Sequence, residues 1–400
     1  MPQPLISIAE ARRRVLRAIK PLPQELVPVT DALERVLAQD IAAAGNTPPF
    51  PCSAMDGYAI KPGPAGRTLR IIGESRAGSP ATQELGDGEA IRISTGAAVP
   101  IGADAVIRQE DIQTNGQTVF TEAAVRAGEN VRLPGEDMRA GTLVLRAGAT
   151  LLAAELGAAV AAGAGVVTVS HRPSVEVFCT GDELRDPGAP LGPGEIHNSN
   201  GPMLVALATR CGAVAKPARG LPDDRAATEV SLANALTRAD VVVVSGGVSV
   251  GPHDHVKPAL AALGVEEVFW GVALQPGKPT WFGTKDDKLV FGLPGNPVSA
   301  YVTFTLFARP ALAAQQGAVV PPAPQAKAVL GADVARNPHR EQALRVRLER
   351  RDETLVALPN GPQASHIVTS LIGADALALI PPGEDVLELG TEVALEPLPR

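Results

Sequence analysis

The sequence predicts a multidomain protein in which a doubly wound α/β domain is joined to two β domains. The chain has 400 residues, and a single hydrophobic core stops growing at about 250–300 residues. After Pro173, apolar runs alternate with helical patterns, and the run 241–244 is entirely valine, as expected for a strand buried on both faces of a parallel sheet. On either side of this region, short apolar runs are interrupted by glycine and proline, which is typical of β domains.

Helices and a small β domain are expected before Pro173. Ser7 and Glu10 form a capping box that predicts a helix over 7–19, and Thr30 is expected to cap a short helix over 30–37. The segment 45–134 is predicted to form the β domain. An Ala-rich helix over 151–162 and a strand over 166–169 follow, and we expect them to pack with the N-terminal helices.

The α/β domain is expected to place its ligand site at the carboxyl ends of its strands, where the connecting loops gather. Its main elements are predicted as strand 175–179, helix 202–211, helix 223–238, strand 241–244, helix 254–262, strand 289–291 and a long helix over 297–314. A proline-rich linker, 317–324, comes next. The alternating run 343–348 then indicates a C-terminal β domain of about 75 residues.

Composition and charge exclude several functions. The net charge is −7 and 3% of residues are aromatic, so the chain lacks the basic footprint and the stacking platforms of a nucleic-acid binder. Cys52, Cys179 and Cys211 include no CxxC pair, which argues against a disulfide framework and favours a reducing cytoplasmic location. The stretch 151–169 approaches the length of a membrane span, but it contains Glu155 and several glycines, so we expect a soluble helix and strand.

Two glycine turns follow predicted strands of the α/β domain. The first is Ser245-Gly246-Gly247, with Ser249 just beyond it, and the second is Pro294-Gly295-Asn296-Pro297. Backbone amides without a nearby Cβ can approach a phosphate or another anion. Tight turns without a ligand are the alternative. Between the two turns, Lys278 lies on a loop stiffened by prolines and is a candidate phosphate clamp, unless it is an ordinary solvated lysine.

Acidic side chains in glycine-bearing loops are candidate Mg²⁺ ligands, because magnesium prefers a few hard oxygen atoms together with substrate phosphate. These side chains are Asp56, Asp137, Asp182, Glu183 and Asp254. Aspartate before glycine is also a common turn pair, so turn chemistry is the alternative for each. The hydroxyl of Thr95 is either an oxyanion contact or a turn cap. His253 and His255 are two residues apart and point in different directions on a helix, so zinc binding is not favoured.

Sequence motifs limit the possible functions, both by their absence and by their presence. No GxSxG, GxxxxGK[ST] or GxGxxG motif occurs, which removes the commonest hydrolase, NTPase and dehydrogenase interpretations. Eight segments spread over essentially the whole chain resemble the MoeA-type molybdopterin molybdenumtransferases, and they are also similar to the C-terminal domain of gephyrin. The segments are TPPFPCSAMDGYAI (47–60), ISTGAAVPIGADAVI (93–107), GENVRLPGEDMRAGT (128–142), TGDEL (180–184), GEIHNSNGPML (194–204), VVVVSGGVSVGPHDHVK (241–257), PGKP (276–279) and GLPGNPVSA (292–300).

The resemblance implies a subunit of four parts and a homodimer. The parts are an elongated helical segment (1–46 and 138–172), a β domain inserted into it (47–137), an α/β molybdopterin-binding domain (173–318) and a C-terminal β barrel (319–400). Adenylylated molybdopterin is expected to lie across the α/β domain of one subunit and the inserted domain of its partner. Carboxylates that are far apart in the chain would then meet.

The resemblance also implies roles for individual residues. The Mg²⁺ ligands would be Asp56, Asp137, Glu183 and Asp254, and the catalytic residues would be Asp56, Asp137, Asp254 and Lys278. Substrate would be bound by Thr95, Glu183, Lys278 and the two glycine turns, that is, Ser245, Gly246, Gly247, Ser249, Pro294, Gly295, Asn296 and Pro297. Asp223 and Asp224 resemble a further acidic position of the family.

Two positions depart from the family pattern. Gln275 and Gly271 stand where many members have lysines. Fewer positive charges are then available to hold an anionic pterin phosphate or molybdate, and Lys278 is expected to carry more of that role.

The activity that the resemblance implies is the insertion of molybdenum from molybdate into adenylylated molybdopterin, with release of AMP and formation of the molybdenum cofactor. A tungstate insertase, the adenylyltransferase of the same pathway and a non-catalytic molybdopterin-binding scaffold are the alternatives. The adenylyltransferase needs no inserted β domain or barrel, although transient contact with it is expected. A scaffold would need none of the acids or Lys278.

Overall fold

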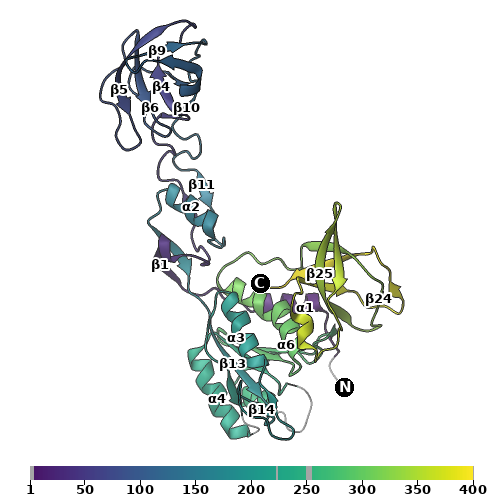
Figure 1. Ribbon diagram of the computed structural model, residues 1–400. Helices are drawn as coiled ribbons and strands as arrows, with labels where there is room; N and C mark the ends of the chain where they lie inside the picture. Colours follow the sequence, from purple (N-terminus) through teal and green to yellow (C-terminus); the bar gives the residue numbers. More distant parts are fainter. Residues whose placement is uncertain (1–3, 222–223, 249–254, 400) are drawn as a thin grey trace.

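The computed structural model describes residues 4–221, 224–248 and 255–399 and is elongated (Figure 1). A β domain lies at one end, and a narrow connecting segment that contains α2 leads from it to the α/β domain. The C-terminal domain lies beside the α/β domain, with α1 between them. The predicted fold class, an α/β domain combined with an inserted β domain and a C-terminal barrel, is confirmed.

The inserted β domain consists of a six-stranded sheet with a core on each face. The strands lie in the order β7-β4-β6-β5-β9-β8. Ile60 and Ala90 enter one core while Ala59 and Ile91 enter the other, as the two-residue period of a strand requires. The elements are β3 (Cys52–Ser53), β4 (Gly57–Ile60), β5 (Thr68–Ser75), β6 (Glu89–Ile93), β7 (Ala105–Arg108), η2 (Gln109–Asp111), β8 (Ile112–Thr114), β9 (Thr118–Thr121) and β10 (Val131–Arg132).

The connecting segment is built from two antiparallel ribbons and one helix. Its elements are β1 (Gln24–Pro28) paired with β12 (Val166–Ser170), β2 (Ile41–Ala42) paired with β11 (Leu143–Leu145), and α2 (Ala153–Ala161). Leu37, Leu151 and Val169 form its small core together with Ala159 of α2. The two chain passages that enter and leave the inserted domain are thereby held side by side.

The helix predicted over 30–37 is wrong. One 3₁₀ turn, η1 (Val29–Asp31), forms there, and Glu34 adopts a positive φ of 61°. The backbone N–H of Glu34 donates to Leu151 O (2.8 Å), and that of Leu37 donates to Ala149 O (2.9 Å). Pairing with a distant backbone therefore overrides the local helix signal.

The N-terminal helix forms as predicted but packs elsewhere. It is α1 (Ile8–Arg17), and Ser7 Oγ accepts from the backbone N–H of Glu10 (3.1 Å). Its buried residues Ile8, Ala11 and Val15 join the core of the α/β domain. The expectation that this helix packs with 151–162 is therefore wrong, because its apolar face covers the end of the larger core.

The α/β domain has a mixed sheet whose centre is parallel. The order is β16-β13-β18-β22-β21-β19, with β17 also paired to β13. Pairs β13–β18 and β18–β22 are parallel, as predicted, whereas β21 runs antiparallel to both of its neighbours. The strands are β13 (Ser174–Thr180), β16 (Val214–Ala215), β17 (Arg219–Leu221), β18 (Val241–Ser245), β19 (Glu266–Trp270), β21 (Trp281–Lys285) and β22 (Lys288–Leu293).

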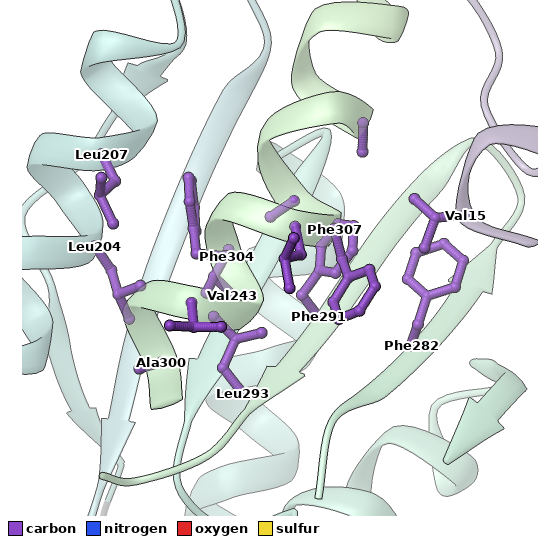
Figure 2. Packing of buried hydrophobic residues seen from close by; sticks show 14 of the residues in the cluster. Val15, Leu204, Leu207, Val243, Phe282, Phe291, Leu293, Ala300, Phe304 and Phe307 are labelled. Atoms are coloured by element: carbon purple, nitrogen blue, oxygen red, sulfur yellow. The ribbon is translucent and has the colours of Figure 1, made fainter. Parts of the chain in front are cut away.

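Helices cover both faces of this sheet. Val241 and Val243 face a core shared with Leu204, Phe304 and neighbouring residues (Figure 2), whereas alternate valines of β18 face the core under α4 and α5. On the first face lie α1, α3 (Asn200–Arg210), α6 (Pro297–Thr303), the π-helix η3 (Phe304–Ala308) and α7 (Arg309–Gln315); on the second lie α4 (Arg225–Arg238) and α5 (Val256–Ala262). The long helix predicted over 297–314 is thus present, with a π turn in its middle.

The C-terminal domain is a closed five-stranded barrel. The strands follow the order β25-β26-β23-β29-β27, and β27 pairs back to β25. β20 (Leu274–Gln275), which belongs to the α/β domain, adds to the edge of β25. The elements are β23 (Ala326–Leu330), β24 (Val334–Ala335), β25 (Glu341–Arg351), β26 (Thr354–Pro359), η4 (Val368–Leu371), β27 (Ala376–Ile380), β28 (Val386–Leu387) and β29 (Glu392–Pro397).

A buried ion cluster fixes α1 and the barrel to the α/β domain. Arg12 Nη1 lies 2.7 Å from Glu396 Oε2, and both side chains are 6% exposed. Arg309 of α7 pairs with the other carboxylate oxygen of Glu396. One carboxylate of β29 therefore joins two helices of the α/β domain to the barrel.

Glu396→Ala is expected to lower the free energy of unfolding of this joint unit by about 3–5 kcal/mol, because it leaves Arg12 buried without a counter-charge. Urea unfolding followed by the fluorescence of Trp270 and Trp281, both in the α/β domain, measures the effect. Glu392→Ala is the matched control on the same strand, since its pair with Lys327 is 61% and 64% exposed and is worth about 0.5 kcal/mol. Equal losses in the two variants would contradict the prediction.

Candidate functional site

A cleft of about 710 Å³ lies at the carboxyl ends of β13, β18 and β22, where the sequence predicts a ligand site. Its walls come from the strand ends, from a flap over 183–199, from the second glycine turn and from a loop of the barrel. The lining residues are Cys179, Thr180, Glu183, Leu184, Ile196, His197, Asn198, Ser199, Asn200, Ser245, Pro279, Pro294, Gly295, Asn296, Pro297, Ser299, His366 and Val368. Polar and apolar side chains both line the cleft, and Glu183 is the carboxylate among these lining residues.

The first glycine turn needs both of its glycines. Gly246 and Gly247 have φ values of 89° and 64°, a region that residues with a Cβ rarely adopt. A Cβ on Gly246 would lie 2.7 Å from Thr180 Oγ1. The N–H of Gly246 donates to Leu293 O (2.9 Å) and is already used within the fold. Of this turn, Ser245 lines the cleft, and Ser249 lies outside the described residues.

The second glycine turn, 294–297, lines the cleft with all four of its residues. Asn200, the first residue of α3, ties the two turns together: its Nδ2 donates to Ser245 Oγ (2.9 Å) and to Gly295 O (2.6 Å). Ser245 Oγ in turn donates to Pro294 O (3.2 Å). The floor of the cleft is therefore one hydrogen-bonded unit.

The flap is a short parallel ribbon of β14 (Leu184–Arg185) and β15 (Ile196–His197). Glu183, exposed and predicted as a site residue, lies at its base, and its carbonyl accepts from the N–H of Ile196 (2.9 Å). Arg185 pairs with Glu195. The N–H of Gly192 and the Arg185 guanidinium lower the pKa of Glu195, so this carboxylate stays ionised and braces the flap.

A loop of the barrel forms another wall of the cleft. Ser365 O accepts from the N–H of Val298 (3.2 Å), and Ser365 Oγ accepts from Asn296 Nδ2 (3.0 Å). The loop is held from below by the fully buried Arg345, whose Nη2 donates to Pro362 O (3.1 Å); desolvation lowers the pKa of Arg345 to about 10. His366 is thereby presented to the cleft.

Asn200 and His366 are among the lining residues that the sequence analysis did not predict. The polar run Asn198-Ser199-Asn200 directly before a helical pattern was a usable signal for the first. For His366 the sequence contains no comparable signal, because it reaches the cleft only through the packing of the barrel on α6. Cys179 also lines the cleft, and burial raises the pKa of its thiol to about 11, so it is neutral at physiological pH.

The acids of the inserted domain lie far from this cleft. Asp56 Oδ1 accepts from the N–H of Thr95 (2.8 Å), and both residues are exposed. Asp137 is exposed and lines a separate pocket of about 460 Å³ together with Arg132 and Glu136. Figure 1 shows the whole connecting segment between this domain and the α/β domain. One chain therefore does not bring Asp56 and Asp137 to Glu183.

Among the described residues, the predicted metal ligands of the inserted domain do not meet Glu183 within one chain. Among residues 4–221, 224–248 and 255–399, no group of three or more His, Cys, Asp or Glu side chains could hold a metal ion. Asp254, His253 and Asp223 lie outside these ranges. Asp224 is the N-cap of α4, and its Oδ1 accepts from the N–H of Ala227 (2.8 Å), while Asp182 is exposed.

Lys278 is exposed and is not among the lining residues of the cleft, although its neighbour Pro279 is. Its side chain lines an adjoining pocket between the α/β domain and the barrel. In the described part of the chain, no helix is long and apolar enough to cross a membrane.

The chain matches three family descriptions in sequence order. Residues 6–163 match the MoeA N-terminal region (domain I and II), residues 176–314 match a probable molybdopterin binding domain, and residues 327–398 match the MoeA C-terminal region (domain IV).

Relatives along the full length carry matching names. The chain is 36% identical to molybdopterin molybdenumtransferase 2 of Mycobacterium tuberculosis, with 98% of each chain covered. It is 33% identical to the molybdopterin molybdenumtransferase of Bacillus subtilis, over 97% of this chain and 93% of that one. A crystal structure of the molybdopterin biosynthesis MoeA protein of Pyrococcus horikoshii superposes with a TM-score of 0.80 at 32% identity, covering 98% of this chain and 99% of that one.

Asn200→Ala is expected to lower the free energy of unfolding by about 1–2 kcal/mol, because it removes the two hydrogen bonds that join the glycine turns. Urea unfolding measures the loss. Thr209→Ala is the control on the same helix, since the Thr209 hydroxyl bonds only to the Val205 carbonyl of its own helix and is exposed; its effect should stay within about 0.5 kcal/mol. A loss for Asn200→Ala no larger than that of the control would show that the turns do not depend on this side chain.

Proposed function

The chain belongs to the MoeA family of molybdopterin molybdenumtransferases, and from this we propose that it inserts molybdenum from molybdate into adenylylated molybdopterin, releasing AMP. Membership makes it a transferase with a role in molybdenum cofactor biosynthesis. The observation that carries the finer proposal is the cleft at the carboxyl ends of β13, β18 and β22, within the region that matches a molybdopterin-binding domain.

The cleft suits a polar heterocycle with a phosphate arm. Its volume of about 710 Å³ lies within the range of small-molecule sites. Asn198, His197 and His366 offer donors and acceptors along its walls, and the turn 294–297 would offer the backbone N–H groups of Gly295 and Asn296 to an anion. The pterin would be held by the walls and its phosphates by the turn.

The acids of the inserted domain would complete the site from a second subunit. Asp137 and Glu183 have exposed carboxylates with no ion pair among the described residues, in two domains that one chain keeps apart. A two-fold homodimer brings such patches together, because each subunit supplies both halves. The carboxylates of Asp56, Asp137, Glu183 and Asp254 provide the hard oxygen donors that would hold Mg²⁺ there, and the ion would neutralise charge on the diphosphate of the substrate.

The reaction combines two balanced changes. The two dithiolene sulfurs bond to molybdenum while one oxo group leaves as water with the two thiol protons. The diphosphate bond to AMP is cleaved, and the oxygen comes either from a separate water or from the departing oxo group of molybdate, which is then transferred to phosphorus instead of leaving as water while the two thiol protons are released. The protein would contribute position and electrostatic stabilisation, because Lys278 beside the cleft and the N–H groups of the second glycine turn would hold anionic groups without forming covalent intermediates.

Two alternative functions would give different experimental results. A tungstate insertase would use the same cleft for a similar oxyanion, and a non-catalytic scaffold would bind molybdopterin without turnover. Exposed, unpaired acids at Asp137 and Glu183 favour a catalytic site, since binding an anionic pterin alone would not require them. We further propose that the enzyme is cytoplasmic and receives its substrate through transient contact with the molybdopterin adenylyltransferase.

Molybdate is expected to trigger AMP release from adenylylated molybdopterin in the presence of Mg²⁺, and Asp137→Asn is expected to slow that release about 100-fold or more. AMP is quantified by chromatography with molybdate, tungstate or no oxyanion. Asp111→Asn, which changes an exposed, ion-paired acid of the same β domain, is the control and should react at the wild-type rate. Release that is independent of oxyanion, or tight pterin binding without release, would refute the insertase.

A mixture of Asp137→Asn and Glu183→Gln chains is expected to recover about a quarter of the wild-type activity after unfolding and reassembly. Half of the random dimers are mixed, and each mixed dimer has one intact site of two if every site combines Asp137 of one chain with Glu183 of the other. Each variant assayed alone is the baseline. A site completed within one chain would give no recovery, because no chain in the mixture carries both side chains.

A further inference from the structure

His366 presents an imidazole ring without a partner to the cleft. The residue is exposed and lines the cleft from the barrel loop 360–371. In the described ranges, neither ring nitrogen forms a hydrogen bond, and the ring takes part in no ion pair. A neutral imidazole has one N–H donor and one acceptor nitrogen. The ring can therefore accept a proton at one nitrogen and donate a proton from the other.

The backbone on both sides of His366 is fixed. Ser365 is bonded to the start of α6 through its backbone carbonyl and its hydroxyl. On the other side, Ile367 O accepts from Ser370 Oγ (2.6 Å), and the buried Arg345 donates from Nε to the same hydroxyl oxygen (3.2 Å). A side chain on such a backbone is held in place before a ligand arrives. The position of the ring is thus set jointly by the barrel and by α6.

The other titratable groups of the cleft are less suited to accept a proton. Burial raises the pKa of the Cys179 thiol to about 11, so the thiol is neutral at physiological pH and is not a base. The ring of His197 is engaged, since its Nε2 lies 3.0 Å from Ala189 O. Glu183 is assigned to Mg²⁺ in the proposed function, and a bound cation opposes protonation of its carboxylate. Among the described residues, His366 is therefore the titratable group of the cleft that is left uncommitted.

The barrel wall also keeps this histidine apart from carboxylates. His366 and Val368 are the lining residues that the barrel contributes, so no acid on this wall competes for a proton. Glu183 belongs to the flap that follows β13, which is a different element. The hydroxyl and amide side chains of the remaining walls do not titrate near neutral pH.

The proposed reaction requires a proton acceptor of this kind. Two thiol protons leave the dithiolene as its sulfurs bond to molybdenum, whichever oxygen is transferred to phosphorus. A side chain that accepts and then releases a proton accelerates such a step by about 10²–10⁴-fold. Histidine is the side chain best matched to this transfer near neutral pH.

We propose that His366 is a catalytic residue that carries the two thiol protons of the substrate away from sulfur. For each proton, the imidazole accepts from a thiol and donates to the departing oxo group, or to solvent when that oxygen is transferred to phosphorus. The ring is neutral before and after each transfer, so protons and charge are conserved. The proposal rests on the proposed function, because the dithiolene and molybdate are the substrates of that reaction.

His366→Gln is expected to slow molybdate-dependent AMP release about 100-fold, because glutamine keeps a hydrogen-bonding side chain but cannot carry a proton. The loss should lie in kcat, and the KM for adenylylated molybdopterin should change by less than about threefold. AMP is quantified by chromatography over a range of substrate concentrations. His171→Ala, which removes an exposed histidine directly after β12, is the matched control and should react as the wild type does.

Free imidazole separates a proton carrier from a structural role. His366→Ala leaves space for a small base at the wall of the cleft, so imidazole added to the buffer should raise its rate about tenfold. The rate of His366→Gln should not respond, because its side chain fills that space. Absence of rescue in His366→Ala, with an unchanged melting temperature, would overturn the relay.

The pH profile gives an independent readout. Wild-type kcat should fall as the pH is lowered from about 8 to about 5, because histidines take up a proton in this range and an imidazolium cannot accept another. His366→Gln should lose this dependence. The other titratable or charged groups around the ring, Cys179, Glu183 and His197 in the cleft and Arg345 behind the loop, are unchanged in that variant. The same dependence in His366→Gln would assign it to one of them and overturn the relay.

The wild type distinguishes a failure of the relay from a failure of the proposed function. Wild-type enzyme that releases AMP only with molybdate, together with His366→Gln that reacts at the same rate, would refute the relay and leave the insertase standing. Wild-type enzyme without molybdate-dependent release would refute the proposed function, and the relay with it.

Discussion

The burial of β18 on both faces is the constraint on which the site depends. Its four valines alternate between two helical layers, so the strand can lie only in the middle of the sheet, between β13 and β22. The three parallel strands then end at the same edge, and the loops that follow them meet there. Asn200 and Ser245 convert this meeting of loops into a hydrogen-bonded floor.

The separation of the inserted domain from the α/β domain follows from a second constraint. The ribbons β1–β12 and β2–β11 hold the two passages of the connecting segment together, and the core around Leu37 and Leu151 stiffens it. The inserted domain is therefore kept at a distance from the cleft of its own chain. Asp137 therefore does not reach the cleft of its own chain.

The sequence predicts the elements of the α/β domain well because their hydrophobic periods are set by burial on both faces. The sequence predicts less where a distant backbone segment competes with a local signal. Thr30 resembles a helix cap, but Glu34 and Leu37 form backbone hydrogen bonds with 149–151 instead of a helix. Glu183, Ser245 and the turn 294–297 were predicted from their residue types, and they line the cleft. His366 was not, since only the packing of the barrel against α6 brings it to the cleft.

Gln275 and Gly271, which stand where many family members have lysines, show the same limit of the sequence analysis. From the sequence, Gln275 and Gly271 are losses of charge, and each position can be judged only by itself. In the fold, Gln275 Oε1 accepts from Asn337 Nδ2, and Asn337 Oδ1 accepts from the N–H of Arg340, which lines the same pocket as Lys278. A lysine at 275 would add a charge but remove the acceptor on which the turn 337–340 depends. The residue type at 275 therefore affects the position of Arg340. The charge near Lys278 depends on all the residues that line the pocket and not on the segment around Lys278 alone.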